Sequence, residues 1–104
     1  MSKIQVSSFG ETIKKLRADS KLPQRKVAAY LDIDTSLLAK YERNLRQPSR
    51  EVINKIAILF NVSSDFLVTE ALSDKIANQI LGEKVGSNIL KVAAEKIKHI
   101  KSKD

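Results

Sequence analysis

The side chains of this sequence are poorly suited to covalent chemistry. There is no cysteine and a single histidine, which excludes thiol nucleophiles, disulfides and cysteine-based zinc sites. No paired carboxylates, phosphate-binding glycine loop or nucleophile–base pair stands out, so we expect neither an enzyme nor a metal or cofactor. Thr35, Ser36 and Lys40 offer a different chemistry. Short polar side chains near a helix N-terminus, followed one turn later by a long cation, suit hydrogen bonding to DNA base edges.

These side chains fall in the second of two short predicted helices. Apolar spacing predicts a helix over 24–31 and another over 35–44, joined by the tight turn 32–34 and capped by Asp34. Such a pair has the geometry of a helix-turn-helix, with the small Ala28 where the two helices cross. The spacing puts Thr35, Ser36, Leu37 and Lys40 on the outward face, and the predicted buried supports are Val27, Leu31, Ile33, Leu38 and Tyr41.

The rest of the chain also has helical spacing. We predict helices over 8–20, over 49–60 with Ser49 as its cap, over 64–70, over 73–81 and over 87–101. No segment alternates with the period of a strand, so the predicted fold class is all-α. The longest apolar run has five residues, 56–60, which is too short to cross a bilayer. The first residues lack the apolar core of a signal peptide, and we expect a cytoplasmic protein.

Composition and charge favour a small helical domain with a polyanionic partner. The chain has 104 residues, of which 42% are apolar and 30% charged, enough for one domain and an appendage. Its net charge is +7, which favours nucleic acid or an anionic membrane surface as the partner. The charge is polarised, because residues 51–72 carry a net −2 between basic segments on either side.

From residue 9 to residue 67 the sequence resembles the Xre-type, lambda-repressor-like helix-turn-helix family. The markers are Gln24, Ala28, the turn at Ile33, Tyr41-Glu42-Arg43, Pro48-Ser49, Ile56-Ala57 and Asn61-Val62-Ser63. The resemblance implies a five-helix DNA-binding domain over 1–70, acting as a dimer on double-stranded DNA, with a C-terminal helical extension over 71–104. Asp32 and Asn44 replace common glycines. Asp32 must then take a left-handed conformation or reshape the turn, and both Asp and Asn tolerate the left-handed conformation better than most residues. Pro23 replaces a usual Ser or Thr cap.

The same resemblance implies roles for single residues. Gln24, Thr35, Ser36 and Lys40 would face the bases, although Lys40 could equally contact a phosphate. The cations expected at phosphates are Arg25, Arg43, Arg46 and Arg50. Arg17 and Glu42 match positions that often form an ion pair, which we take as structural.

The extension carries an apolar seam, formed by Leu90, Ala93, Ile97 and Ile100, with Ile80 in the helix predicted before it. A seam spaced by three and four residues indicates helix packing, so we expect a dimer or partner interface there. The last helix is rich in lysine but has no Trp or Phe to anchor it, which argues against membrane docking. The predicted function is a dimeric repressor or autoregulator on a near-palindromic operator. The alternative is an antitoxin-like protein whose C-terminal helices bind a protein partner while the other domain autoregulates its operon.

Overall fold

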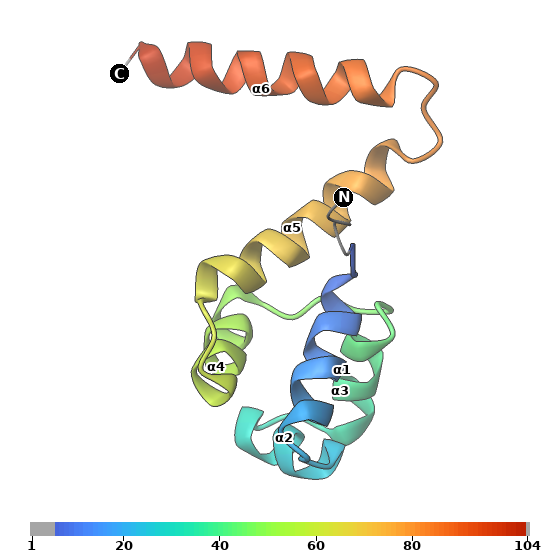
Figure 1. Ribbon diagram of the computed structural model, residues 1–104, viewed down its shortest axis with the longest axis vertical. Coiled ribbons are helices and arrows are strands. Elements are labelled where there is room, and N and C mark those ends of the chain that lie inside the picture. Colours follow the sequence, from blue (N-terminus) through green and yellow to red (C-terminus); the bar gives the residue numbers. More distant parts are fainter. Residues whose placement is uncertain (1–5, 104) are drawn as a thin grey trace, which may run out of the picture. The chain divides into compact units, whose positions relative to one another are not determined.

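The computed structural model describes residues 6–103, and this part of the chain folds into six α-helices without a strand. The helices are α1 (Phe9–Asp19), α2 (Gln24–Leu31), α3 (Thr35–Glu42), α4 (Arg50–Phe60), α5 (Ser64–Ile80) and α6 (Gly86–Ser102) (Figure 1). The predicted all-α class is therefore confirmed. The chain forms two compact units that meet between Asp74 and Lys75, so α5 begins in the first unit and ends in the second.

Side-chain caps fix the starts of α1 and α4. Ser8 Oγ accepts a hydrogen bond from the N–H of Glu11 at 3.1 Å, and the N–H of Ser8 donates to Glu11 Oε1 at 3.0 Å. Ser49, predicted as a cap, accepts from the N–H of Val52 at 3.3 Å. These bonds satisfy N–H groups that have no partner inside the helix, and such caps contribute about 1 kcal/mol.

The turns before and after α3 have the backbone conformations that the sequence predicts, but one of the predicted caps is not formed. Asp32 and Asn44 are left-handed, with φ of 57° and 61°, as predicted for residues that replace glycine. Pro23 precedes α2 without a side-chain cap, also as predicted. Asp34 stands at the N-cap of α3, but its carboxylate accepts no capping hydrogen bond, so that prediction is wrong. α3 ends at Glu42, two residues before the predicted end.

The core of the first unit is drawn from all of its five helices. Leu37, predicted on the outward face, is half-buried and packs against this core, because α3 lies closely against its neighbours. The largest fully buried side chains, each less than 2% exposed, are those of Phe9, Leu31, Leu38, Ile56 and Leu67. Around them lie Ile13, Val27, Ala28, Tyr41, Ile53, Ala57 and Ala71.

α5 is one helix of 17 residues, whereas the sequence suggested a helix ending at Glu70 and a new one capped by Ser73. The Ser73 hydroxyl donates to the carbonyl of Glu70 at 3.1 Å, so it bonds back into the helix and does not cap a new one. Tertiary contacts hold the continuous helix on both sides of this point. Gln47 Nε2 donates to the carbonyl of Ala71 at 2.7 Å, and Asp74 Oδ2 accepts from the N–H of Phe9 at 2.7 Å.

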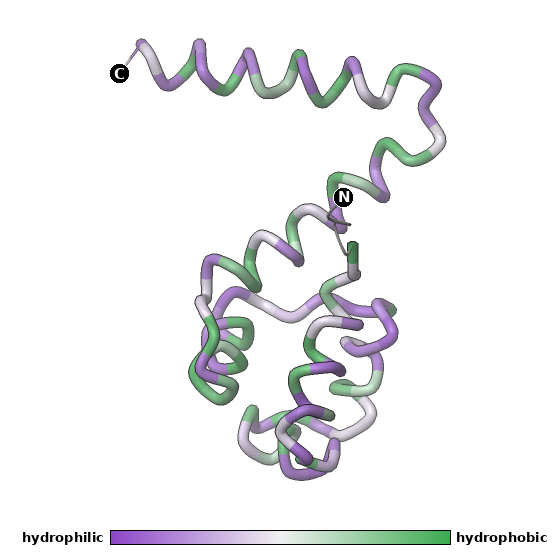
Figure 2. The backbone as a smooth tube through the Cα atoms, in the orientation of Figure 1, coloured by the Kyte–Doolittle hydropathy of each residue, from purple (hydrophilic) through white to green (hydrophobic). Residues whose placement is uncertain are grey.

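The second unit contains the end of α5, a short turn and α6. Ile80 is half-buried, and a Cβ placed on Gly86 would lie 3.8 Å from Ile80 Cδ1, so Ile80 lies within van der Waals range of the start of α6. No residue of α6 is buried. Apolar and polar residues alternate along α6 with the helical period (Figure 2). Within residues 6–103 no helix is long and apolar enough to span a bilayer.

Candidate nucleic-acid interface

α2, its three-residue turn and α3 form a helix-turn-helix at the surface of the first unit. The left-handed Asp32 lets the chain reverse, and the N–H of Ile33 donates to the carbonyl of Ala28 at 3.0 Å. In this pattern the N–H groups just after α2 bond to carbonyl groups in its last turn, which ends the helix. Ala28 is 1% exposed, consistent with a close approach of the two helices that a larger side chain would prevent. The turn therefore fixes α3 rigidly against α2.

The two faces of α3 differ in burial and in bonding. Leu38 and Tyr41 point into the core and are 1% and 5% exposed. Thr35, Ser36 and Lys40, which sequence assigned to base contacts, are all exposed. Across the described residues their side chains make no hydrogen bond or ion pair, so their polar groups are available to an external ligand.

The four arginines assigned to phosphates lie around this helix pair. Arg25 is in the first turn of α2, Arg43 is the C-cap residue that follows α3, Arg46 lies in the loop after it and Arg50 begins α4. All four are exposed, and neither of the two salt bridges of the described chain involves them. Their charges are thus not neutralised by the fold itself.

The N-terminus of α2 is electropositive for two further reasons. Its first turn contains Arg25 and Lys26 but no acidic residue, and Pro23 provides no side-chain cap. The positive end of the helix dipole lies at the N-terminus and favours negative charge there, so cations at this position are unfavourable for the helix. Stability of the isolated fold does not account for this placement, whereas an anion outside the protein would be attracted to it.

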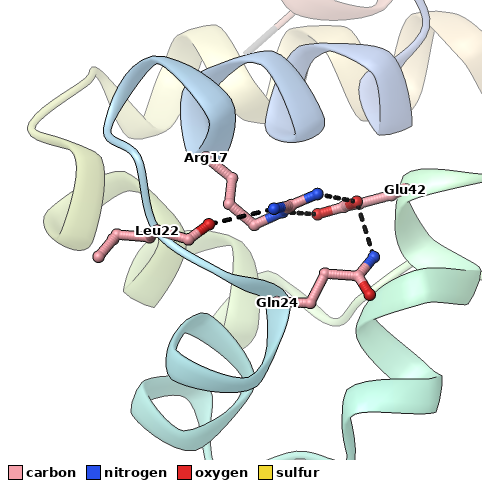
Figure 3. Close-up of polar contacts among 4 residues, drawn as sticks. All are labelled: Arg17, Leu22, Gln24 and Glu42. Carbon is pink, nitrogen blue, oxygen red and sulfur yellow. Dashed lines mark hydrogen bonds and ion pairs between the residues drawn. The ribbon is translucent and has the colours of Figure 1, made fainter.

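A buried polar network joins α1, α2 and α3 beneath this surface (Figure 3). The Glu42 carboxylate accepts from Arg17 Nε at 2.7 Å and from Arg17 Nη2 at 3.0 Å. Gln24 Nε2 donates to the same carboxylate at 3.0 Å, and Arg17 Nη1 donates to the carbonyl of Leu22 at 3.1 Å. The structure thus brings Arg17 and Glu42 together as an ion pair, with side chains 17% and 4% exposed.

The hydrogen bonds from its side chain to Glu42 raise the pKa of Arg17, outweighing the opposing effect of burial. The guanidinium is therefore charged throughout the physiological range. Sequence had treated Gln24 only as a base contact and missed its bond to Glu42. The sequence does contain a signal for this bond, because Gln24 is the first residue of α2 and Glu42 the last residue of α3 in one helix-turn-helix motif.

Sequence reasoning also missed how the N-terminus of α1 is held. The N–H of Gly10 donates to Asn44 Oδ1 at 2.9 Å, and Asn44 Nδ2 donates to Ser8 Oγ at 2.8 Å. With Asp74 on the N–H of Phe9, the first N–H groups of α1 are bonded to side chains from three parts of the chain. No local pattern around Asp74 or Asn44 indicates these partners, which are 65 and 34 residues away.

The residues assigned to a dimer or partner interface lie in the second unit. Leu90, Ile97 and Ile100 are 47%, 54% and 63% exposed, and Ala93 is exposed as well. Ile80 alone is half-buried, against the start of α6. A hollow of about 340 Å³ runs along α6 beside Ile89, Val92 and Lys96. In the single chain this apolar face has little cover.

Comparisons with known proteins agree with this geometry. Residues 13–67, more than half of the chain, match the family described as Helix-turn-helix (HTH_3). The HTH-type transcriptional regulator ImmR of Bacillus subtilis (strain 168) is 29% identical over 89 residues, covering 85% of this chain and 70% of ImmR. YqaE, an uncharacterized HTH-type transcriptional regulator of the same organism, is 31% identical over 68 residues, or 65% of this chain and 59% of YqaE.

Two solved structures share the fold. A transcriptional regulator from Listeria innocua superposes with a TM-score of 0.57 at 21% identity, covering 93% of this chain and 97% of that chain. A chain of a SinR protein/SinI protein complex superposes with a TM-score of 0.54 at 23% identity, covering 90% of this chain and 98% of that chain. With its family match, its relatives and its helix-turn-helix geometry, the chain belongs to the Xre-type, lambda-repressor-like helix-turn-helix family of DNA-binding transcriptional regulators.

Proposed function

We propose that this protein binds a near-palindromic operator as a homodimer and acts there as a repressor or autoregulator. The observation that carries the proposal is the outer face of α3, where Thr35, Ser36 and Lys40 are exposed and unengaged above a buried support. A helix presented in this way fits the major groove, with its N-terminal residues toward the base edges. Thr35 and Ser36 would read bases, and Lys40 would reach a base or a phosphate one turn later.

Phosphate contacts would set the register of α3 on the duplex. Arg25, Arg43, Arg46 and Arg50 surround the helix pair and have no acidic partner among the described residues. Contacts to phosphates add affinity without sequence information and release counterions, so their contribution falls as salt rises. Specificity would thus come from α3, while the arginines would supply most of the salt-dependent affinity.

Dimerisation would use the second unit. Leu90, Ala93, Ile97 and Ile100 form an exposed seam on α6, and apolar side chains in such a row favour burial against another helix. A second copy of the same segment would provide that helix. Two copies of α3 would then contact half-sites about 34 Å apart, one turn of DNA, which is why the operator should be close to palindromic.

One observation favours the alternative, a protein partner bound by α6 in an antitoxin-like protein. Residues 91–101 of the helix contain four lysines, at 91, 96, 98 and 101, and one acidic residue, Glu95. Two such helices packed together would bring like charges close, whereas an acidic helix would complement them. Strong self-association would speak against this alternative, and a monomer at micromolar concentration would favour it.

Selection of bound sequences from a random DNA pool at about 0.15 M salt tests the DNA-binding proposal, because nonspecific attraction is damped there. We expect a two-fold-symmetric site. On that site Lys40→Ala should weaken binding by about 1–3 kcal/mol and change the preferred base if Lys40 contacts one. Arg43→Ala should weaken binding to all sequences alike and lower the salt slope by about one. Lys14→Ala, an exposed lysine of α1, is the control. Wild-type behaviour of both variants would overturn the assigned surface.

Sedimentation of the full chain tests the dimer. Ile97→Gln should raise the dimer dissociation constant at least about 100-fold, because burial of an Ile is worth about 1.5–3 kcal/mol and each dimer loses two. Lys98→Gln, one residue further and on the polar side of α6, should leave it unchanged. Equal self-association of wild type and Ile97→Gln would show that the seam is not the interface.

A further inference from the structure

The buried Glu42 is bonded to Gln24, a side chain that the family resemblance assigns to the DNA bases. Gln24 is half-buried at the start of α2, and its Nε2 lies 3.0 Å from Glu42 Oε1. Arg17 donates two further hydrogen bonds to this carboxylate, at 2.7 and 3.0 Å. Glu42 is 6% exposed, so water does not compete freely for it.

An ionised carboxylate can only accept hydrogen bonds, so it determines which way the Gln24 amide is turned. The amide nitrogen must face Glu42, because the opposite orientation would set the amide oxygen against carboxylate oxygens. The oxygen Oε1 is consequently directed away from Glu42, as Figure 3 shows. Arg17 holds the Glu42 carboxylate in place through two hydrogen bonds, so the orientation of Gln24 is built into the packing of three helices.

We propose that Glu42 is a positioning residue that makes Gln24 an acceptor for the exocyclic amino group of a base, on adenine or on cytosine. A carbonyl oxygen turned away from Glu42 is repelled by phosphate oxygens, which are also acceptors, but it matches an N–H donor on a base edge. Adenine offers its N6 amino group in the major groove and cytosine its N4 amino group. The inference rests on the proposed function, because it assigns a chemical preference to one side chain of that interface.

The test uses the full chain and the operator selected by the wild-type protein. Each adenine of the site is replaced in turn by purine, which lacks the 6-amino group, and each cytosine by pyrimidin-2-one, which lacks the 4-amino group. We expect one position per half-site at which the wild-type protein loses affinity about 5-fold or more and Gln24→Met loses nothing further. Gln79→Met, an exposed glutamine of α5, should respond as the wild type does.

Glu42→Gln tests the positioning role separately. An amide at this position can present an N–H to Gln24, which removes the reason for its orientation, so the response to that one base analogue should weaken while other base preferences remain. Loss of stability alone would not change one base preference selectively. If Glu42→Gln does not fold, the side-chain amide of Gln24 in the wild-type protein, assigned by NMR with Gln24→Met, should exchange its protons slowly because one is hydrogen-bonded.

The outcomes separate this inference from the proposed function. If the wild-type protein selects no DNA site, both fail. If it selects a site but Gln24→Met retains the response to every base analogue, or weakens binding to all sequences alike, Gln24 contacts phosphate or nothing and this inference is overturned. Rapid exchange of both Gln24 amide protons would overturn the role of Glu42.

Discussion

Replacing Arg17 by Met tests whether the Arg17–Glu42 pair holds the first unit together. Met retains an unbranched side chain of similar reach but removes the guanidinium. The variant loses both hydrogen bonds to Glu42, at 2.7 and 3.0 Å, and the bond to the carbonyl of Leu22 at 3.1 Å. Glu42, with its side chain 4% exposed, would keep only the donation from Gln24 at 3.0 Å.

The expected loss is large because a buried charge is left without its counter-ion. Hydrogen bonds to charged groups contribute about 1.5–3 kcal/mol each, so the two lost by Glu42 amount to about 3–6 kcal/mol. Breaking one side of a buried ion pair typically costs about 3–5 kcal/mol, in the same range. The free energy of unfolding should therefore fall by about 3–5 kcal/mol, from a typical total of about 5–15 kcal/mol. The melting temperature should drop by at least about 12 °C.

Urea and thermal unfolding followed by circular dichroism at pH 7 measure this loss. Arg17→Met combined with Glu42→Leu should recover most of it, because no buried charge then lacks a partner. Lys15→Met is the matched surface control, since it removes the exposed 3.0 Å pair between Lys15 and Asp19 and should cost less than about 1 kcal/mol. A loss below about 1 kcal/mol for Arg17→Met, or no recovery in the double variant, would refute the reasoning.

Two further predictions concern the N-terminus of α1. Gly10→Ala should lower the free energy of unfolding by about 1–3 kcal/mol in urea unfolding, because its Cβ would lie 2.5 Å from the Tyr41 carbonyl oxygen. In Gly82→Ala the new Cβ would have no neighbouring atom within 4 Å, so the free energy of unfolding should change by less than about 0.5 kcal/mol. Equal losses of stability in the two variants would disprove the close contact at Gly10. The backbone N–H and then the hydroxyl of Ser8 lower the pKa of Glu11 below 4.5. The ionised Glu11 carboxylate thus stabilises the folded state above pH 4.5, and this stabilisation is lost as the pH falls through the lowered pKa. The difference in melting temperature between wild type and Glu11→Gln should accordingly shrink from pH 6 to pH 3, and a constant difference would contradict this.

Local features of the sequence were sufficient to predict where most helices begin and how the chain turns. The caps at Ser8 and Ser49 and the left-handed residues Asp32 and Asn44 are determined by side chains within a few residues of the helix end. The apolar spacing likewise identifies the buried face of α1, α2, α3 and α4, because burial follows the helical period. For the same reason the exposed face of α3 could be predicted, apart from Leu37.

Long-range contacts were decisive where the sequence failed. Ser73 has the local character of a cap, yet α5 continues through it, because Gln47 and Phe9 bond to Ala71 and Asp74 on either side. Partners that are tens of residues apart leave no periodic or capping signal, and their contribution exists only after the helices have packed.

The candidate DNA-binding surface shows the same division. The residue types and spacing of Thr35, Ser36 and Lys40 were sufficient to predict an exposed polar face, and their family motif supplied Arg17 and Glu42 as a pair. Only the tertiary structure turned the amide nitrogen of Gln24 toward Glu42 and its oxygen away from Glu42. Sequence determines which groups can form hydrogen bonds, but the packing of α1, α2 and α3 decides which of those groups are already engaged, and in which direction the rest point.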